Sequence, residues 1–280
     1  MANDWRADKA RVEQAARIDI TMPSAIRIAD YFDGGRDNFE VDRKAARALV
    51  ATAPVIGAVA PARRSFLRRV VRYLMVEAGV RQFLFVGITL AATNAHQVVW
   101  SADPGCRIVV ADDDPLVLAH ARALIRPVAD GVAGHPERAV GYVHAGPRDP
   151  AAIVAGASAT LDFGQPVAVI MMFVLGFIQK TATAADFVSA LADGMASGSH
   201  FAIHHLASDL DPALKTAVRR WNQQSLERIT LRSHAEVESL VAGLELVPPG
   251  VVPISEWHPD PADPHSGTVV PLHGVVARKP

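Results

Sequence analysis

The chain has 280 residues, of which 50% are hydrophobic and 20% are charged, and its formal net charge is −1 at pH 7. A chain of this length and composition can bury a substantial core, either as one large α/β domain or as two small domains. The nearly balanced charge gives no electrostatic reason to expect nucleic acid or an anionic membrane as a partner.

Helical spacing dominates the N-terminal residues 1–78. The segment PSAIRIADYF begins with good first-turn residues, and the DGG that follows it predicts a turn. Residues 62–79 place apolar side chains on one face and arginines on the other, which we interpret as a solvated face from which one or two arginines could contact a ligand carboxylate. The predicted helices are residues 4–18, 23–32, 40–53 and 62–79.

After Gly79, apolar runs alternate with helical segments, which is typical of βαβ units and a parallel sheet. The predicted strands are residues 82–87, 107–112, 138–145, 166–174 and 200–206. The predicted helices are residues 93–102, 114–129, 149–157, 183–195, 212–228 and 233–243. The last two apolar runs, 244–254 and 268–279, are joined by a proline-rich loop, and they predict an antiparallel hairpin at the end of the chain.

The single cysteine, Cys106, excludes an internal disulfide and a zinc site built on cysteines, and it is typical of a reducing compartment. Residues 1–14 contain no apolar run and predict no signal peptide. The longest apolar run, 167–178, is too short to span a bilayer and favours a strand buried on both faces. We therefore expect a soluble cytoplasmic protein.

The first strand and its turn carry the first candidate binding residues, because doubly wound sheets bind ligands at the carboxyl ends of their strands. Gly87 ends the first strand and can bring its backbone close to a ligand. Asp112 ends the second strand. Its separation from Gly87 along the chain is close to the spacing at which an acidic residue accepts hydrogen bonds from ribose hydroxyls. Asp114, followed by Pro115, predicts a helix N-cap, and the cap and the ribose site are compatible.

Two adjacent histidines, His204 and His205, end the fifth predicted strand, so one should point into the pocket and the other away from it. Either could act as a general base, and a hydrogen-bonded structural histidine is the alternative. Neighbouring positions on one strand cannot aim both rings at one ion, and the later histidines lack ligand spacing, so no metal site is expected.

These segments resemble the S-adenosyl methyltransferase family from residue 18 to residue 280. The opening signature appears as Tyr31, Gly34, Gly35, Asn38 and Phe39, and RRSFLRRVVRYL, VVADDDPLVLAHARALI and GVVARKP are further similar segments. The resemblance implies an α/β class I methyltransferase fold, a Rossmann-like, doubly wound sheet of seven strands with an N-terminal helical cap. It also implies that S-adenosylmethionine is bound, with Asp112 on its ribose and Asp113 near its adenine.

The sequence departs from the family pattern where polar contacts to this cofactor are expected. Phe85 stands where the family has Asp, Thr89 where it has Gly, and Gly146 where it has Asp ahead of a retained Arg148. A family His aligns with Gly176. Losing a charge-assisted hydrogen bond at Phe85 or Gly146 costs about 1.5–3 kcal/mol each.

We therefore keep two hypotheses open. The first is an S-adenosylmethionine-dependent methyltransferase acting on a small molecule; the second is a repurposed member of the fold that has lost the cofactor or the transfer reaction. A nicotinamide-dependent oxidoreductase is disfavoured, because Ile88 and Thr89 do not supply the glycines that its turn requires.

The predicted organisation is a helical cap over residues 1–78 and a Rossmann-like methyltransferase domain over residues 79–280, forming one structural unit. The expected partner is a small molecule rather than nucleic acid or a membrane, and a homodimer stays open. The candidate residues are His205 and Tyr31 for catalysis; Phe85, Gly87, Thr89, Asp112, Asp113, Gly146 and Arg148 for the cofactor; and Asn38, Arg64, Met172 and Gly176 for the substrate.

Overall fold

A mixed β-sheet forms the centre of the computed structural model, which describes residues 19–87, 95–125, 139–265 and 267–280. Its strand order is β3-β2-β1-β4-β5-β8-β6, and β7 pairs with β8 beside β6. The five parallel strands are β1 (Gln82–Val86), β2 (Arg107–Asp112), β3 (Val140–His144), β4 (Ala168–Met172) and β5 (His200–Leu206). Every residue of β1 and β4 is buried, as expected for central strands covered on both faces.

The C-terminal strand β8 (Leu272–Arg278) runs antiparallel to β5 and lies between it and two short strands, β6 (Glu245–Leu246) and β7 (Val252–Pro253). Both short strands pair with β8, so β6 and β7 together occupy one of the seven predicted strand positions, and the sheet has eight strands. Pro248 and Pro249 lie between them, and because proline lacks an N–H it cannot continue a hydrogen-bonded ladder. The predicted terminal hairpin is therefore confirmed, with its first arm divided.

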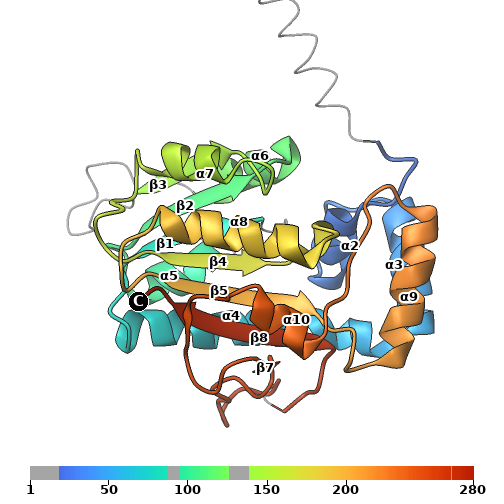
Figure 1. Cartoon of the computed structure of the whole chain (residues 1–280). Helices are drawn as coiled ribbons and strands as arrows, with labels where there is room; N and C mark the ends of the chain where they lie inside the picture. The colour runs from blue at the N-terminus through green and yellow to red at the C-terminus, as the bar shows by residue number, and fades with distance from the viewer. Residues whose placement is uncertain (1–18, 88–94, 126–138, 266) are drawn as a thin grey trace, which may run out of the picture.

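Two layers of helices cover the sheet (Figure 1). Alternate strand residues such as Phe83 and Ile108 pack with α4 (Val59–Val76), α5 (Ala95–Ala102) and α6 (Pro115–Leu124). The intervening residues, such as Leu84 and Val109, pack with α7 (Pro150–Ala157), α8 (Thr181–Asp193) and α10 (His234–Ser239). This division follows from the two-residue period of strands and confirms the predicted doubly wound fold.

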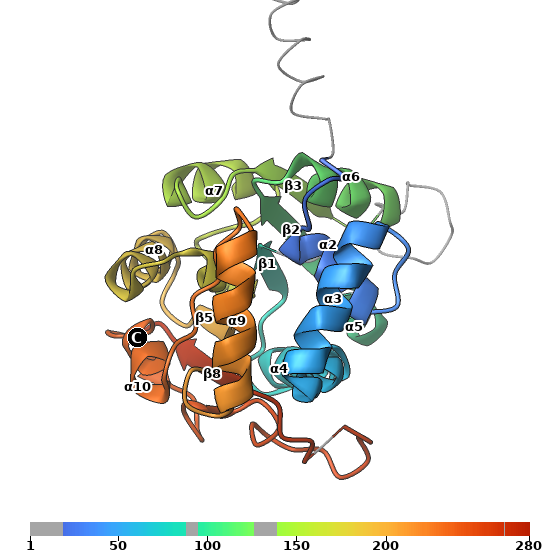
Figure 2. The ribbon, with the colours of Figure 1, turned by 90° about the vertical axis from the view of Figure 1, so that its right-hand side faces the viewer.

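A third group of helices lies beyond the carboxyl ends of β4 and β5 (Figures 1 and 2). It consists of α2 (Ala25–Phe32), α3 (Glu40–Thr52), the short η1 (Pro54–Ala58) and α9 (Pro212–Gln224). Ile28, Ala46 and Trp221 form its small core. The cap thus combines N-terminal helices with a helix from the second half of the chain, whereas α4 packs in the same core as the sheet.

Most element boundaries lie within a few residues of the predicted ones, but α10 ends at Ser239 rather than at residue 243, and β8 begins at Leu272 rather than at residue 268. The N-cap at Asp114 is confirmed, because its side chain accepts a hydrogen bond from the Leu116 amide at 2.8 Å. The predicted helix 4–18 lies outside the described residues. Within the described part, no single helix is long and apolar enough to cross a membrane; α3 and η1–α4 meet those limits only together, and they are bent by 118°.

Candidate functional site

Gly87 follows β1 in a conformation that only glycine adopts readily, with φ +65°. Its amide donates a hydrogen bond to the Ala111 carbonyl at 3.0 Å, which joins the ends of β1 and β2. A Cβ built on Gly87 would lie 2.2 Å from the Cβ of Val174, so a side chain would clash as well as strain the backbone. Gly87 is therefore required here for two reasons, and the predicted Thr89 lies outside the described residues.

Phe85 is buried in the core on the α4–α6 side of the sheet, where its ring stacks on Phe83 with centroids 6.4 Å apart. Met172, at the end of β4, belongs to the same core. We predicted that Phe85 contacts the cofactor and Met172 the substrate, and the two side chains are only 2% and 3% exposed. Both side chains point from their strands towards the layer of helices α4, α5 and α6.

The acidic residues Asp112 and Asp113, at the end of β2, differ in burial. Asp112 is buried, and its Oδ1 accepts a hydrogen bond from the Asp114 amide at 2.8 Å. Asp113 is exposed beside Gly146, where a built Cβ would lie 2.6 Å from the Asp113 carboxyl carbon. The glycine therefore leaves room for this Asp113 side chain. Arg148, two residues further on, is exposed.

Asn38 and Tyr31 belong to the internal framework of the cap. Asn38 is buried and donates from Nδ2 to the Asp30 carboxylate at 2.8 Å and to the Gly35 carbonyl at 3.1 Å. These bonds hold the loop between α2 and α3. Tyr31 is half-buried beside Phe32, with ring centroids 5.7 Å apart, and it is not among the residues that line the cavity.

The arginines of α4 form the predicted solvated face only in part, because Arg64 and Arg68 are exposed whereas Arg63 and Arg69 are buried. Arg63 is buried and pairs with Asp33, which also pairs with the more exposed Arg64. Arg69 is buried and donates to the Trp257 carbonyl at 2.9 Å. The prediction was wrong for Arg63 and Arg69 because partners distant in the sequence satisfy their charges, and a helical wheel cannot show such partners.

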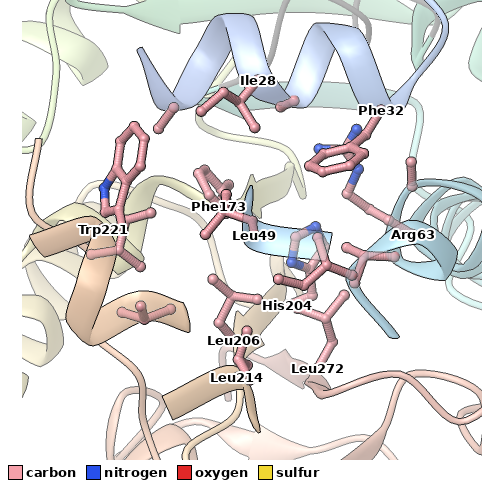
Figure 3. Close-up of a pocket in the computed structure, with 17 residues that line it drawn as sticks. Ile28, Phe32, Leu49, Arg63, Phe173, His204, Leu206, Leu214, Trp221 and Leu272 are labelled. Atoms are coloured by element: carbon pink, nitrogen blue, oxygen red, sulfur yellow. The ribbon is translucent and has the colours of Figure 1, made fainter. Parts of the chain in front are cut away.

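A cavity of about 110 Å³ lies between the cap and the carboxyl ends of β4 and β5 (Figure 3). Apolar side chains from α2, α3, α4, α9 and the strand ends form nearly all of its wall. The polar exceptions are His204, Arg63 and the indole of Trp221, which donates to the Glu227 carbonyl at 2.6 Å. The lining residues include Ile28, Phe32, Leu49, Val59, Phe173, Leu206, Leu214, Val218, Ile229 and Leu272.

His204, and not His205, faces this cavity. The two rings point to opposite faces of β5, as strand alternation requires, and His205, the residue that we predicted to be catalytic, is not among the residues that line the cavity. His204 is 1% exposed, and neither ring nitrogen has a hydrogen-bond partner among the described residues. Burial, with Arg63 nearby, lowers the pKa of His204 well below the ordinary value.

His205 lies on the other face of the sheet and serves as a hydrogen-bond acceptor for Arg232, with His205 Nε2 and Arg232 Nη1 separated by 2.6 Å. Its Nδ1 lies 2.9 Å from the Leu206 carbonyl. Burial lowers the pKa of His205 to about 4. The ring is therefore neutral near pH 7 and is fully engaged in the framework.

Gly176 lies in the short helix η3 (Val174–Phe177) that follows β4, and its carbonyl accepts from the Thr230 amide at 2.8 Å. A Cβ built there would meet only the Thr230 carbonyl oxygen, at 4.0 Å, so a side chain has room to start. The glycine is therefore not required by local packing in the way that Gly87 is.

The family model described as "S-adenosyl methyltransferase" matches residues 11–280. The chain belongs to the S-adenosyl methyltransferase family. A comparison with curated protein sequences gave no match.

Solved structures agree with the family assignment. A DUF574 family protein from Streptomyces avermitilis MA-4680 shares 34% identity over 94% of this chain and 100% of its own, with a TM-score of 0.84. A putative methyltransferase from Thermobifida fusca YX shares 33% identity over 93% of this chain and 96% of its own, with a TM-score of 0.78. The plantazolicin methyltransferase BpumL, at 10% identity and a TM-score of 0.51, shares the fold alone.

Sequence reasoning about this family member missed two residues that shape the site. Trp221 lines the cavity from α9, and Arg232 fixes β5 to the segment after β4 by donating to the Leu175 carbonyl at 2.7 Å. The amphipathic pattern of α9 predicted the helix. Nothing in that pattern indicated that its apolar face would meet α2 and α3.

Proposed function

We propose that the protein transfers a methyl group from S-adenosylmethionine to a small molecule bound in the cavity beneath the cap. The observation that carries this proposal is the position of the cavity at the carboxyl ends of β4 and β5. Gly87 and Asp112 end the neighbouring strands β1 and β2 at the same edge of the sheet. Ligands of doubly wound folds bind at this edge.

The residues after β2 fit the nucleoside half of the cofactor. Asp112 is a buried carboxylate, and a carboxylate offers about four lone-pair sites, so it can accept from ribose hydroxyls beside its bond to the Asp114 amide. Asp113 would accept from the adenine amine, and Gly87 would bring its main chain close to the cofactor. Gly146 would leave space beside Asp113. The bound group would supply a methyl carbon activated by a positively charged sulfur.

The chain's own contribution to methyl transfer would be position and exclusion of water. Cap helices α2, α3 and α9 cover the cavity with apolar side chains, which keeps the reacting groups dry and close together. A volume of about 110 Å³ suits a small molecule rather than a polymer. We also propose that the protein is cytoplasmic and has neither nucleic acid nor a membrane as a partner. A homodimer is compatible with this proposal.

A second candidate function is ligand binding without methyl transfer, and Phe85 favours it. A family carboxylate is replaced there by a ring stacked in the core, which supplies no polar group to the amino-acid half of the cofactor. One lost charge-assisted bond costs about 1.5–3 kcal/mol, or roughly tenfold to a hundredfold in affinity. Retention of Asp112 supports the first candidate more strongly.

Calorimetric titration with S-adenosylhomocysteine tests the choice. We expect the wild type to bind it and the Asp112→Asn variant to bind it at least about tenfold more weakly, because one charged acceptor is lost. Asp149→Asn is the matched control, since Asp149 caps α7 after β3 and Asn is an equivalent cap. Absence of heat with the wild type at millimolar ligand would reject methyl transfer from S-adenosylmethionine and favour the second candidate.

A further inference from the structure

His204 is a polar side chain in an almost entirely apolar wall. It is 1% exposed, lines the cavity, and has no partner for either ring nitrogen among the described residues. Figure 3 shows its imidazole among Phe32, Phe173 and the leucines at the ends of β5 and β8. A buried polar group without a partner costs folding free energy, so its presence here requires a reason other than stability.

None of the described residues around His204 forms a hydrogen bond with its ring nitrogens. Arg63, the nearest charged side chain of the wall, is engaged with Asp33. A buried water needs two to four polar partners, and this wall offers too few of them. His234 and His273, by contrast, have ring nitrogens within 2.9 Å and 2.6 Å of acceptors. His204 is therefore placed to meet a group that the protein itself does not provide.

The ring is neutral near pH 7, because burial and the positive charge of Arg63 oppose its protonation and lower its pKa. A neutral imidazole has one nitrogen that donates and one that accepts. The unpaired acceptor nitrogen suits a hydroxyl donor on a ligand. A carboxylate ligand is disfavoured, because Asp33 already neutralises Arg63 and no other cation lines the cavity among the described residues.

We propose that the cavity binds a single-ring, mainly apolar molecule bearing one hydroxyl, a phenol in the simplest case, whose hydroxyl donates to His204. The volume of about 110 Å³ is close to that of apolar cavities that hold one benzene ring. Phe32, Phe173 and Trp221 supply aromatic surfaces for such a ring. Phenols would then be the substrate class of the proposed methyl transfer. The binding site itself does not depend on the proposed function, whereas the reaction at that site does.

In that reaction His204 would receive the hydroxyl proton. The hydroxyl oxygen would form the new bond to the methyl carbon, and the bond from that carbon to sulfur would break with its electron pair remaining on sulfur. The proton would move to the acceptor nitrogen of His204 and leave from there to solvent after product release. Atoms and charge balance, since the positive charge passes from the sulfur to the imidazolium.

Calorimetric titration with phenol and toluene, in the absence of any cofactor, tests the site. The two probes are similar in size, but phenol carries a hydroxyl group where toluene carries a methyl group. We expect His204→Leu to weaken phenol binding at least about tenfold, because the hydroxyl loses a buried hydrogen-bond partner. The affinity for toluene should stay within about threefold of the wild-type value. His120→Leu, on α6 outside the cavity, is the matched control and should change neither affinity.

Thermal unfolding of the same variants separates a ligand partner from a structural histidine. His204→Leu should unfold at the same temperature as the wild type or higher, because it removes an unpaired buried polar group. A lower unfolding temperature, equal losses for both probes, or no binding of phenol by the wild type would each overturn the proposal. Phenol binding together with failure to bind S-adenosylhomocysteine would retain this site and reject the proposed function alone.

Discussion

At the scale of single residues, Arg232 and His205 form a buried pair that holds the end of β5. Arg232 is fully buried and donates to the carbonyls of Leu175 and Ile178 as well as to His205. Since the guanidinium only donates, His205 must present an unprotonated Nε2 to it. Burial is the main cause of the low pKa of His205, and protonation would also remove that acceptor and place a second positive charge beside Arg232.

This pair predicts that stability falls with acidification. The pKa of His205 is 6.5 as an ordinary value and about 4 in the folded protein, so between these values the unfolded chain binds the extra proton. The unfolding free energy should therefore drop by about 2 kcal/mol between pH 8 and pH 5 from this residue alone, measured by urea denaturation. The stabilisation from His205 is complete above pH 6.5, its ordinary pKa, and is lost as the pH falls towards about 4, its pKa in the folded protein.

The His205→Gln variant provides the comparison for this pH dependence. Its amide oxygen can accept from Arg232 but does not titrate, so the drop from pH 8 to pH 5 should shrink by about 2 kcal/mol. The comparison is needed because His200 and His204 also have lowered pKa values and contribute in the same direction. An unchanged slope in this variant would show that the pKa of His205 is not lowered in the folded protein.

At the scale of elements, Glu227 fastens two cap helices to each other. It follows α9, and its Oε2 accepts from the Ala25 amide at the start of α2 at 2.6 Å. Its own carbonyl accepts from the Trp221 indole at 2.6 Å. A carboxylate at a helix N-terminus is favourable, although burial raises the pKa of Glu227. This contact joins segments that are far apart in the chain, and it involves Ala25 and Trp221 of the cavity wall.

We expect Glu227→Ala to loosen α2 more than Glu227→Gln does, because glutamine keeps an acceptor and loses only the charge. Hydrogen exchange of the α2 amides should accelerate about tenfold in the alanine variant, the effect of losing about 1.4 kcal/mol locally. Glu40→Ala is the control, since Glu40 is exposed and, within the described part of the chain, its ion pairs are with arginines of its own helix α3. Equal exchange in all three variants would mean that Glu227 does not hold the cap closed.

At the scale of the whole molecule, the C-terminal strand completes the sheet. β8 separates β5 from β6 and β7, and six of its seven residues are buried. Val275 and Ala277 pack in one core layer and Leu272 and Val276 in the other. Fully burying each large apolar side chain is worth about 1.5–3 kcal/mol, so this strand alone carries a large part of a typical total of about 5–15 kcal/mol.

A chain that ends at Pro271 should therefore show no cooperative thermal unfolding by circular dichroism. Removal of Pro280 alone is the control and should leave the transition unchanged, because Pro280 follows the last strand. A cooperative transition near the wild-type temperature in the truncated chain would show that β1 to β5 form a stable sheet without β8.

Features that depend on neighbouring residues were predictable from the sequence, whereas contacts between distant segments were not. The apolar run 167–178 already indicated a strand buried on both faces, and Asp114 with Pro115 indicated a helix start, because these signals are local. The orientation of His204 and His205 needed the register of β5 against β8, since alternation states only that they differ. The partners of Arg63 and Arg69 lie in segments far away in the chain, and no local pattern identifies them.

The amino-acid sequence by itself determined the family, the alternation of strands and helices, and the acids at the end of β2. These features depend on periodicity and on residues close together in the chain. Only the tertiary structure decided that α9 completes the cap, that Phe85 lies in the core, and that His204 faces the cavity. The physical reason is that a cavity is formed by surfaces from distant segments, and their meeting depends on how the whole core packs.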